Sequence, residues 1–442
     1  MTLPKSHNYD PKHIFDIMVI GSGIAGMAAS LYAVNRGLST VQAGSAGGTL
    51  FTSGLLDLMA VYPLTEKRLW IDPWEGIEAL RRDGSRHPYT RISNEDIEKA
   101  FEEIVAFLNA VGMNFRCEKN RNVQVITSMG TQKCTYCVPG SMWHAVEAFE
   151  KKEPCLIADF RGLKEFSARQ IVASLKREWP SARPARVIFP GMAGRDEVHA
   201  VHLAQALELS ETRVALAGLV KPEIREARSV GFPAVLGIKR TGAILAHLEK
   251  LMGVPVFEIP TMPASVPGFR LKEVFDSELP KRGLLRLIDK RVESVARSAS
   301  GNFLLRIGGP DSEQLIQARG VILATGRFMG KGLLSTREGI YEPLFNLPLH
   351  QPAGRVSWHH VQFLHPAGHP INCAGVEVDD LFRPVDRTGR VIHDNLFAAG
   401  IILAHQDWMR MKCGSGLAIA TAYAAVNACM DSFINKSDRD TA

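Results

Sequence analysis

Four histidines lie close together in the last third of the chain and are candidates for proton transfer. Histidine changes its charge nearer to neutral pH than any other side chain, so it is the commonest general acid or base. We predict that His360 and His365 are catalytic, together with the cation Arg337 that precedes them in the sequence. His350 and His359 are further candidates, although histidines in such segments more often only form hydrogen bonds or face solvent.

Two cations directly follow a predicted turn and are candidates for holding a phosphate group. Arg327 and Lys331 come after the sequence Ala324-Thr325-Gly326. Guanidinium and ammonium groups are the usual partners of phosphate oxygens in proteins. We therefore predict that Arg327 and Lys331 bind the phosphate of a substrate; the alternative is that each is a solvated surface charge.

The chain has seven cysteines, of which Cys134 and Cys137 form the only close pair. One such pair, without a second pair or nearby histidine ligands, is weak evidence for a metal or redox site. We expect ordinary reduced thiols in a reducing compartment and predict no metal site.

A strand, a glycine turn and a helix near the start of the chain are the clearest signal for the fold that positions these groups. An apolar run at residues 17–20 predicts a buried parallel strand, and Gly21, Gly23 and Gly26 follow at the dinucleotide-binding spacing. In this motif the first glycine allows the tight turn, the second lets a pyrophosphate approach the backbone, and the third lets the helix pack on the strand. The N-terminus of the helix then faces the phosphates.

The acidic residue that completes this fingerprint is missing. The second strand, at about residues 39–43, should end in the Asp or Glu that holds an adenosine ribose. The sequence there is Thr40-Val-Gln-Ala-Gly44, in which Gln42 could supply a weaker ribose contact. The missing acid puts tight binding of an adenine dinucleotide in doubt and leaves open a nucleotide-binding scaffold that has lost its ligand.

Two later blocks favour a flavoprotein. Residues 319–326 predict a buried strand that ends in Ala-Thr-Gly, and residues 394–400 with 414–422 predict a strand, a loop and a small-residue helix. Ile401 stands where such proteins usually carry an acid for the flavin's sugar chain, and Arg410 or Lys412 could supply positive charge to the flavin. The predicted cofactor-binding residues are Gly21, Ser22, Gly23, Gly26, Gln42, Ser53, Gly54, Ala324, Thr325, Gly326, Gly400, Gly414, Ser415 and Gly416.

The fold class that these blocks predict is α/β, with a Rossmann-like FAD/NAD(P)-binding domain of glutathione-reductase-like type and an inserted α/β cap. We expect a discontinuous flavin-binding domain at residues 14–60, 281–345 and 385–435, an inserted cap or substrate domain at 61–280, and a second cap segment at 346–384. Within the cap, apolar spacing predicts helices at residues 97–108, 166–179 and 198–209 and a strand that begins at 186. The Pro-rich segment 258–271 is not expected to be regular helix.

Composition excludes several classes of protein. The 442 residues are 46% hydrophobic and 22% charged, which excludes disordered and fibrous chains. The formal net charge is +6 and the basic residues are scattered, so nucleic-acid binding is unsupported. No uninterrupted apolar run of transmembrane length and no signal-peptide stretch is found, so we expect the chain in the cytoplasm.

With these motifs, the chain resembles the B-subunit family of anaerobic glycerol-3-phosphate dehydrogenase, in the glutathione-reductase-like flavoprotein superfamily. The Pro-rich segment and the Ser-Gly-Leu-Leu-Asp-Leu run are more discriminating than the glycines, which many families share. The resemblance is least clear at about residues 110–255. The matching stretches are the glycine fingerprint, residues 52–58 and 87–89, the Pro-rich segment 258–271, residues 323–333 and 337–343, and the carboxy-terminal glycine block.

This resemblance implies oxidation of sn-glycerol 3-phosphate to dihydroxyacetone phosphate, with electrons passed to quinone through a membrane-associated partner. It also implies a second flavoprotein subunit and a membrane-associated iron–sulfur subunit as partners, and a peripheral position at the inner face of the cell membrane. The cofactor that it implies is FMN, in agreement with the missing ribose acid. The glycine fingerprint alone predicts FAD, so the choice between FMN and FAD stays open.

Two other functions remain alternatives at the level of sequence. The first is a flavin-bearing electron-transfer or structural subunit without substrate chemistry of its own, favoured by the missing acids and by the lack of a clear base. The second is an RNA-modifying flavoprotein, which the sequence pI near 8.9 favours but which lacks a basic tract.

Overall fold

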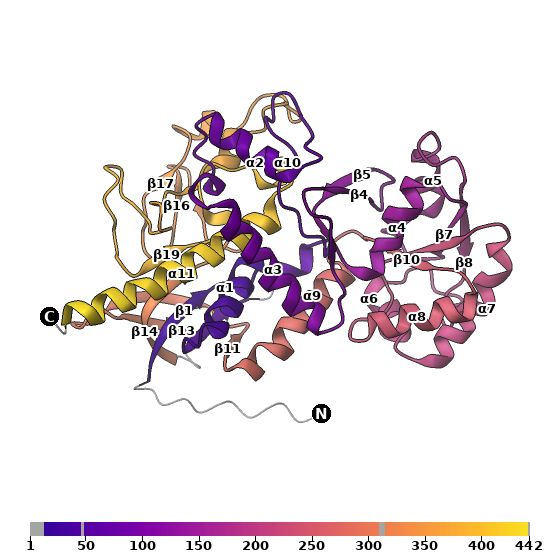
Figure 1. The fold of residues 1–442 in the computed structure, drawn as a ribbon, viewed down its shortest axis with the longest axis horizontal. Helices are drawn as coiled ribbons and strands as arrows, with labels where there is room; N and C mark the ends of the chain where they lie inside the picture. Colours follow the sequence, from indigo (N-terminus) through magenta and orange to yellow (C-terminus); the bar gives the residue numbers. More distant parts are fainter. Residues whose placement is uncertain (1–12, 46–47, 309–313, 441–442) are drawn as a thin grey trace.

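The computed structural model describes residues 13–45, 48–308 and 314–440, which form two lobes (Figure 1). The first lobe is built on a seven-stranded sheet in the order β11-β2-β1-β14-β13-β12, with β19 paired to β14. Strands β11, β2, β1, β14 and β19 run parallel to one another, and β13 pairs antiparallel with β14 on one side and with β12 on the other. The strands are β1 (Ile14–Ile20), β2 (Thr40–Gly44), β11 (Leu285–Ile288), β12 (Val292–Arg297), β13 (Phe303–Ile307), β14 (Gln314–Leu323) and β19 (Leu396–Ala398).

Two helices of small residues lie against this sheet. Helix α1 (Ile24–Asn35) begins directly after the glycine turn, and its alanines are buried because they let it approach the strands closely. Helix α11 (Gly414–Asp440) packs against α1 and also against α3 (Asn94–Ala110) (Figure 1). The span Gly414–Ile434 is long and apolar enough to cross a membrane, but here it forms part of the hydrophobic core.

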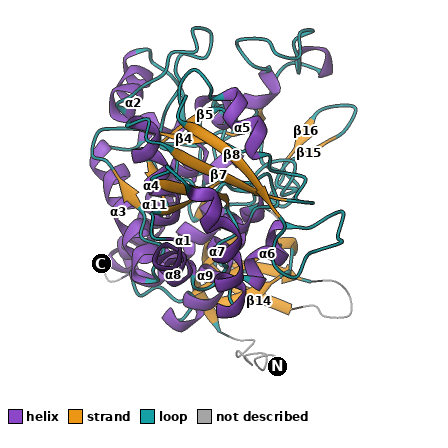
Figure 2. Ribbon diagram, turned by 90° about the vertical axis from the view of Figure 1, so that its right-hand side faces the viewer, coloured by secondary structure: helices purple, strands orange, loops and turns teal. Residues whose placement is uncertain are grey.

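The second lobe has its own sheet and its own core. Its four parallel strands have the order β10-β9-β7-β8, and helices surround them (Figures 1 and 2). Fully buried aromatic side chains, including Phe160, Phe189 and Phe232, fill this core. The elements are β7 (Cys155–Phe160), β8 (Ala182–Val187), β9 (Ser229–Pro233), β10 (Val256–Ile259), α4 (Gly140–Glu150), α5 (Ala168–Ser174), α6 (Ala200–Ala206), α7 (Ser210–Ile224) and α8 (Thr241–Met252).

Shorter elements connect the two lobes or cover the first lobe. The hairpin of β4 and β5 lies on the side of the second lobe that faces the first, and β16 and β17 lie in the first lobe (Figure 1). Strand β3 pairs with β6, β15 with β16, and β17 with β18. These elements are α2 (Pro73–Arg82), β3 (Arg116–Cys117), β4 (Val123–Ile126), β5 (Gln132–Thr135), β6 (Cys137–Val138), α9 (Val266–Glu278), β15 (Leu334–Ser335), β16 (Ile340–Tyr341), β17 (Leu349–His350), β18 (Gly375–Val376) and α10 (Trp408–Met411).

The predicted α/β class is confirmed, and the structure differs from the sequence-based expectation in several elements. Helix α9 starts inside the Pro-rich segment, because Pro267 occupies the first turn, where a missing N–H costs nothing. Helices α5 and α6 are shorter than the apolar spacing predicts, and β8 begins before residue 186 and ends at Val187.

The inserted lobe is also smaller than the predicted cap of residues 61–280. Its core contains residues from Ile126 to Val266. Helices α2 and α3 bury Ile77, Leu80 and Phe101 in the core of the first lobe instead, and α9 does the same with Leu271 and Phe275. Amphipathic spacing predicts that a helix has a buried face but does not specify which core receives it.

Candidate functional site

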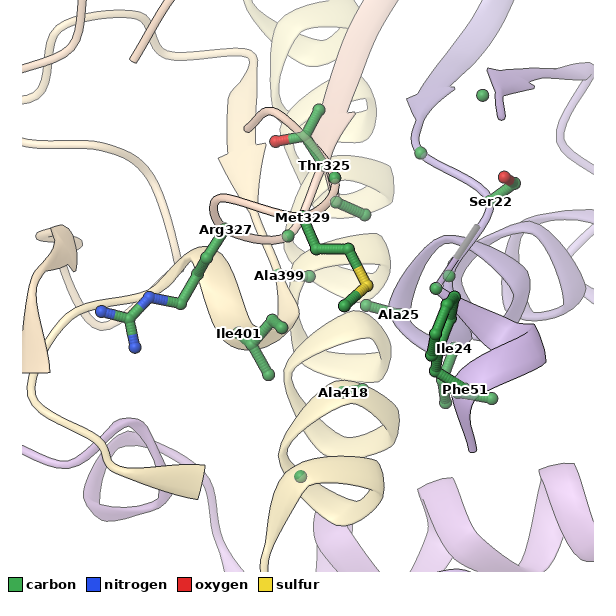
Figure 3. A pocket seen from close by; sticks show the side chains of 18 of the residues that line it. Ser22, Ile24, Ala25, Phe51, Thr325, Arg327, Met329, Ala399, Ile401 and Ala418 are labelled. Atoms are coloured by element: carbon green, nitrogen blue, oxygen red, sulfur yellow. The ribbon is translucent and has the colours of Figure 1, made fainter. Parts of the chain in front are cut away.

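A cavity of about 780 Å³ lies in the first lobe between the glycine turn, the turn after β14 and the start of α11. Its volume is in the range of sites for small molecules and cofactors. Figure 3 shows apolar side chains from separate segments around it, among them Ile24, Phe51, Met329 and Ile401. The predicted cofactor-binding residues that line this cavity are Gly21, Ser22, Gly23, Ser53, Ala324, Thr325, Gly326, Gly414 and Ser415.

The three glycines of the turn have different surroundings. Gly21 has φ +125°, and a Cβ there would lie 2.2 Å from the carbonyl oxygen of Ala324. A Cβ at Gly26 would lie 2.1 Å from the carbonyl oxygen of Gly21, so this glycine is needed for the packing of α1. A Cβ at Gly23 would meet no atom within 4 Å, although Gly23 lines the cavity. The space beside Gly23 is therefore available to a ligand at the N-terminus of α1, which has no side-chain cap.

Gln42, which we predicted to contact a ribose, is not at the cavity. Its side chain is fully buried, and its Nε2 donates a hydrogen bond to the carbonyl oxygen of Gly21 at 3.0 Å. Gly44 and Ser45, at the end of β2, line the cavity instead. Gln42 is therefore not in position for a ribose contact at the cavity, because its side chain points back toward the glycine turn, and Gly44 carries no side chain that could replace the acid.

Gly26, Gly54, Gly400 and Gly416, which we also predicted to bind the cofactor, do not line the cavity. A Cβ at Gly400 would lie 2.6 Å from Cβ of Ala25, and one at Gly416 would lie 2.5 Å from the carbonyl oxygen of Asp57. A Cβ at Gly54 would lie 2.6 Å from Cβ of Pro267. These glycines allow close packing behind the cavity wall.

An ion pair that the sequence analysis missed lies at the cavity. Lys133 of β5 and Asp57 both line it, and Nζ of Lys133 is 3.0 Å from Oδ2 of Asp57. The hydroxyl of Thr135 donates to Oδ1 of Asp57 at 2.7 Å, and the backbone N–H of Asp57 donates to Oγ of Ser415 at 2.6 Å. Asp57 lies within the Ser-Gly-Leu-Leu-Asp-Leu run that carries the family resemblance, and this run could have indicated Asp57 as a site residue. No feature of the sequence indicates that Lys133 reaches the cavity.

Arg327 lines the cavity, but its guanidinium already forms hydrogen bonds with the backbone. It donates to the backbone carbonyl oxygens of Asn372 and, at 2.6 Å, of Ile371. Burial lowers the pKa of this guanidinium. In Figure 3 its side chain extends away from Met329 and Ala25. The prediction that Arg327 binds a phosphate is therefore not supported by its geometry, because both terminal nitrogens hold the loop at residues 371–372.

The other predicted cations divide between the cavity and the surface. Lys331 is exposed and lines the cavity, so it stays a candidate for binding a phosphate. Arg337 is exposed and is not among the lining residues. Arg410 pairs with Asp407 at 3.2 Å, and Lys412 is exposed; neither lines the cavity.

None of the four candidate histidines lines the cavity. His360 is exposed and stacks on the half-buried His365 with 3.8 Å between ring centroids. His359 is exposed, and His350 lies beside His405. The structure thus separates these residues from the cavity: His360 and His365 lie in the surface loop that follows β17, and Arg337 lies in the exposed turn between β15 and β16.

Two of the seven cysteines differ from the expectation of reduced thiols, and the other five are free. Cys117 and Cys137 form a disulfide, because β3 pairs antiparallel with β6 and sets these two residues opposite each other. Cys134 is buried separately, and burial raises the pKa of its thiol to about 11. Cys134 and Cys137 therefore do not act as a pair.

Comparisons with known proteins give a consistent result. Residues 16–417 match the family model described as FAD binding domain. The chain is 27% identical over 427 residues to the B-subunit of anaerobic glycerol-3-phosphate dehydrogenase from Vibrio vulnificus (strain YJ016), covering 94% of this chain and 96% of that protein. It is 30% identical over 429 residues to the probable B-subunit of the same enzyme from Halobacterium salinarum (strain ATCC 29341 / DSM 671 / R1), covering 94% and 98%.

Among solved structures, a similar one is 3-ketosteroid delta1-dehydrogenase from Sterolibacterium denitrificans. It is 12% identical to this chain, with a TM-score of 0.42, and the alignment covers 95% of this chain and 100% of that one.

The residues at the cavity fit a flavin. The open space beside Gly23 and the uncapped N-terminus of α1 suit a phosphate group, and the apolar side chains of Ile24, Phe51 and Ile401 suit an aromatic ring system. Lys133 and Asp57 add one cation and one carboxylate to this largely apolar site. The arrangement can hold a flavin and provides charged groups beside it for a small polar substrate.

Proposed function

Because the chain belongs to the FAD binding domain family, and within it to the B-subunit family of anaerobic glycerol-3-phosphate dehydrogenase, we propose that it oxidises sn-glycerol 3-phosphate to dihydroxyacetone phosphate. Flavin is the cofactor of this family. When bound, it supplies a two-electron acceptor for a hydride. The observation that carries the proposal is the pair of Lys133 and Asp57, which brings a cation and a carboxylate to the cavity.

In this proposal Asp57 is the base. It is the one carboxylate among the described residues that line the cavity. As C2 of the substrate loses its hydride, Asp57 accepts the proton of the C2 hydroxyl, so the secondary alcohol becomes a ketone and two electrons leave the substrate. The hydrogen bond from Thr135 and the ion pair with Lys133 hold the carboxylate in place for this step.

Lys133 and Lys331 hold the phosphate of the substrate in this proposal. Both line the cavity, and they come from different segments, β5 and the turn after β14. An ammonium group has three N–H donors, so Lys133 can donate to a phosphate oxygen while it keeps its ion pair with Asp57. This assignment replaces Arg327, whose terminal nitrogens are bonded to backbone carbonyls.

The proposed flavin is FAD. Besides the glycine turn, the cavity is lined by Gly44 and Ser45 at the end of β2 and by Arg291 and Val292 at the start of β12. The end of the second strand is where dinucleotide-binding folds hold an adenosine ribose. Lining residues on this side support a dinucleotide, and the family description favours the same choice over FMN.

The proposal also includes partners and a location. The relatives are named as subunits, which supports a complex in which electrons leave this chain for another subunit. We propose a second flavoprotein subunit and a membrane-associated iron–sulfur subunit as partners, quinone as the final acceptor, and a position at the cytoplasmic face of the membrane through those partners.

The test is product formation by the purified, flavin-loaded chain with an artificial electron acceptor. We expect dihydroxyacetone phosphate from sn-glycerol 3-phosphate but not from glycerol, and a rate at least about 100-fold lower in Asp57→Asn, because a positioned base contributes that much or more. Flavin content serves as the control for folding of the variant. If no product forms although dithionite reduces the flavin, the chain is an electron-transfer subunit instead.

A further inference from the structure

Two histidines and a glutamate converge outside the cavity. Oε1 of Glu377 lies 2.9 Å from Nε2 of His405 and 3.7 Å from Nδ1 of His350. One ligand atom from each of these three residues lies within 4.8 Å of the other two. The rings of His350 and His405 are 4.2 Å apart between centroids, and all three side chains are half-buried.

Backbone pairing explains why residues so distant in the sequence meet. His350 of β17 pairs with Gly375 of β18, and Glu377 follows two residues later, so both side chains project from the same face of this small sheet. A third segment lies alongside, since the N–H of Ala404 donates to the carbonyl oxygen of Val376 at 3.0 Å.

Two backbone features bring the third ligand into position. A Cβ at Gly375 would lie 2.4 Å from the carbonyl oxygen of Ile402, so only glycine lets the segments approach this closely. His405 has φ +63°, a conformation that is uncommon for residues other than glycine and that turns the chain directly after the third segment. Nε2 of His405 then reaches Glu377.

We infer that His350, Glu377 and His405 form a binding site for a divalent transition-metal ion. Two imidazole nitrogens and one carboxylate oxygen suit Zn²⁺, Fe²⁺ or Co²⁺, whereas Mg²⁺ and Ca²⁺ prefer oxygen ligands alone. Three protein ligands leave at least one coordination position for water. The sequence analysis predicts no metal site, because spacing alone could not reveal ligands contributed by three separate segments.

Arg86 is the cation that this site must accommodate. Its Nη2 lies 2.9 Å from Oε1 of Glu377, but its side chain is 59% exposed. An exposed ion pair of this kind contributes little free energy. A metal ion on Oε1 displaces Arg86 toward solvent or toward Oε2, where it stays as an outer partner of the ligand carboxylate.

The metal ion would link the three segments of the first lobe that contain His350, Glu377 and His405. His405 is followed by Gln406, Asp407 and Trp408, and Trp408 lines the cavity. A metal at this site therefore stabilises one wall of the cavity from outside, without touching a ligand in it. The inference does not depend on the proposed substrate.

The test is metal binding by the flavin-loaded chain after treatment with a chelator. Titration with Zn²⁺ in a calorimeter should give one ion per chain, and Co²⁺ should add a visible absorption of histidine-bound metal. His350→Ala, His405→Ala and Glu377→Gln should each weaken Zn²⁺ binding by at least about tenfold. His360→Ala, in the surface loop, is the matched control and should bind as the original chain does.

Flavin content shows whether each variant has folded, and Glu377→Gln changes the side chain least. Zn²⁺ should also raise the thermal unfolding temperature of the original chain and of His360→Ala, but not that of the three ligand variants. The inference is overturned if the chelator-treated chain binds no Zn²⁺. It is overturned equally if folded ligand variants keep the affinity of the original chain, or if His360→Ala loses it.

Discussion

Gly23 and Gly26 belong to one glycine turn, but their missing side chains have different consequences. We expect Gly23→Ala to fold with little loss of stability and to lose most of its flavin, because the added methyl enters the space left for a phosphate. Gly26→Ala should instead destabilise the fold by several kcal/mol, because its methyl would overlap the carbonyl of Gly21. Flavin absorbance and thermal unfolding of both purified variants measure the two effects.

The structure thus predicts loss of flavin in Gly23→Ala and loss of stability in Gly26→Ala. Equal loss of stability in both would mean that the space beside Gly23 is filled by the protein itself. Full flavin content in Gly23→Ala would mean that the cofactor phosphates lie elsewhere.

Lys133 should contribute to the affinity for the substrate. Replacing it by Gln should raise KM for sn-glycerol 3-phosphate by about tenfold or more, because a hydrogen bond to a charged group is worth about 1.5–3 kcal/mol. Flavin content should stay unchanged. The control is Lys119→Gln, whose side chain is 80% exposed and pairs with Glu98. An unchanged KM in Lys133→Gln would remove Lys133 from the phosphate site.

His87 gives the fold a dependence on pH. Burial, with a smaller contribution from His405, lowers its pKa from 6.5 to about 3. Below pH 6.5 the unfolded chain therefore binds a proton that the folded chain does not bind until about pH 3, so acidification favours unfolding. This group alone should lower the free energy of unfolding by about 2 kcal/mol between pH 7 and pH 5.

Comparison with His87→Gln isolates this contribution. The variant is expected to be less stable than the original chain at pH 7, because the contacts of His87 with Tyr89 and Cys413 are lost. The difference in free energy should shrink by about 2 kcal/mol at pH 5. Urea unfolding at both pH values measures it, with the exposed His202→Gln as control; a constant difference would contradict the buried neutral state of His87.

Single residues were predictable where a backbone rule applies to them and unpredictable where tertiary packing decides. The spacing of Gly21, Gly23 and Gly26 specifies a turn, and Ser415 follows from the start of a helix. Lys133 lies in an ordinary polar strand, and only the packing of that hairpin beside Asp57 brings it to the cavity. His360 and His365 were predicted from their residue type and their place in a histidine-rich segment, neither of which reveals whether a loop turns inward.

At the scale of elements, α9 is fixed beside the cavity by its N-cap residue, Ser265. The buried hydroxyl of Ser265 caps the helix by accepting from the N–H of Gly268 at 3.1 Å, and it donates to the carbonyl oxygen of Thr52 at 2.5 Å. Thr52 lines the cavity. Ser265→Ala should therefore cost about 1–3 kcal/mol of stability and weaken flavin binding.

Thermal unfolding and flavin titration of Ser265→Ala check this expectation. Ser277→Ala, at an exposed position near the other end of the same helix, is the control and should behave as the original chain does. Wild-type stability and flavin affinity in Ser265→Ala would show that the link between α9 and Thr52 contributes nothing.

Helices and strands with a clear apolar pattern in the sequence were predictable, and very short strands and the start of α9 were not. The strand of residues 17–20 and helix α3 follow from apolar runs and amphipathic spacing. Two-residue strands such as β17 and β18 carry no such signal, although they create the cluster of His350 and Glu377. The prediction for the start of α9 was wrong because proline is disfavoured in the interior of a helix but tolerated in its first turn.

At the scale of the whole molecule, the chain combines a flavin-binding lobe with an inserted lobe that has a core of its own. The α/β fold and the discontinuous order of the glycine blocks were predictable, because each block carries a backbone motif. The size of the insertion was not, because amphipathic helices at residues 73–110 could have packed on either core. The hairpin of β4 and β5 lies at this junction and contributes Lys133 to the cavity.

An anaerobic titration tests most directly whether this chain itself oxidises sn-glycerol 3-phosphate with a bound flavin. The freshly purified chain is titrated with sn-glycerol 3-phosphate while flavin absorbance is recorded, and the cofactor is then released by heat and identified. The account predicts that the substrate bleaches the flavin, that dihydroxyacetone phosphate forms in equal amount, and that the released cofactor is FAD. A flavin that dithionite bleaches but sn-glycerol 3-phosphate does not would contradict it.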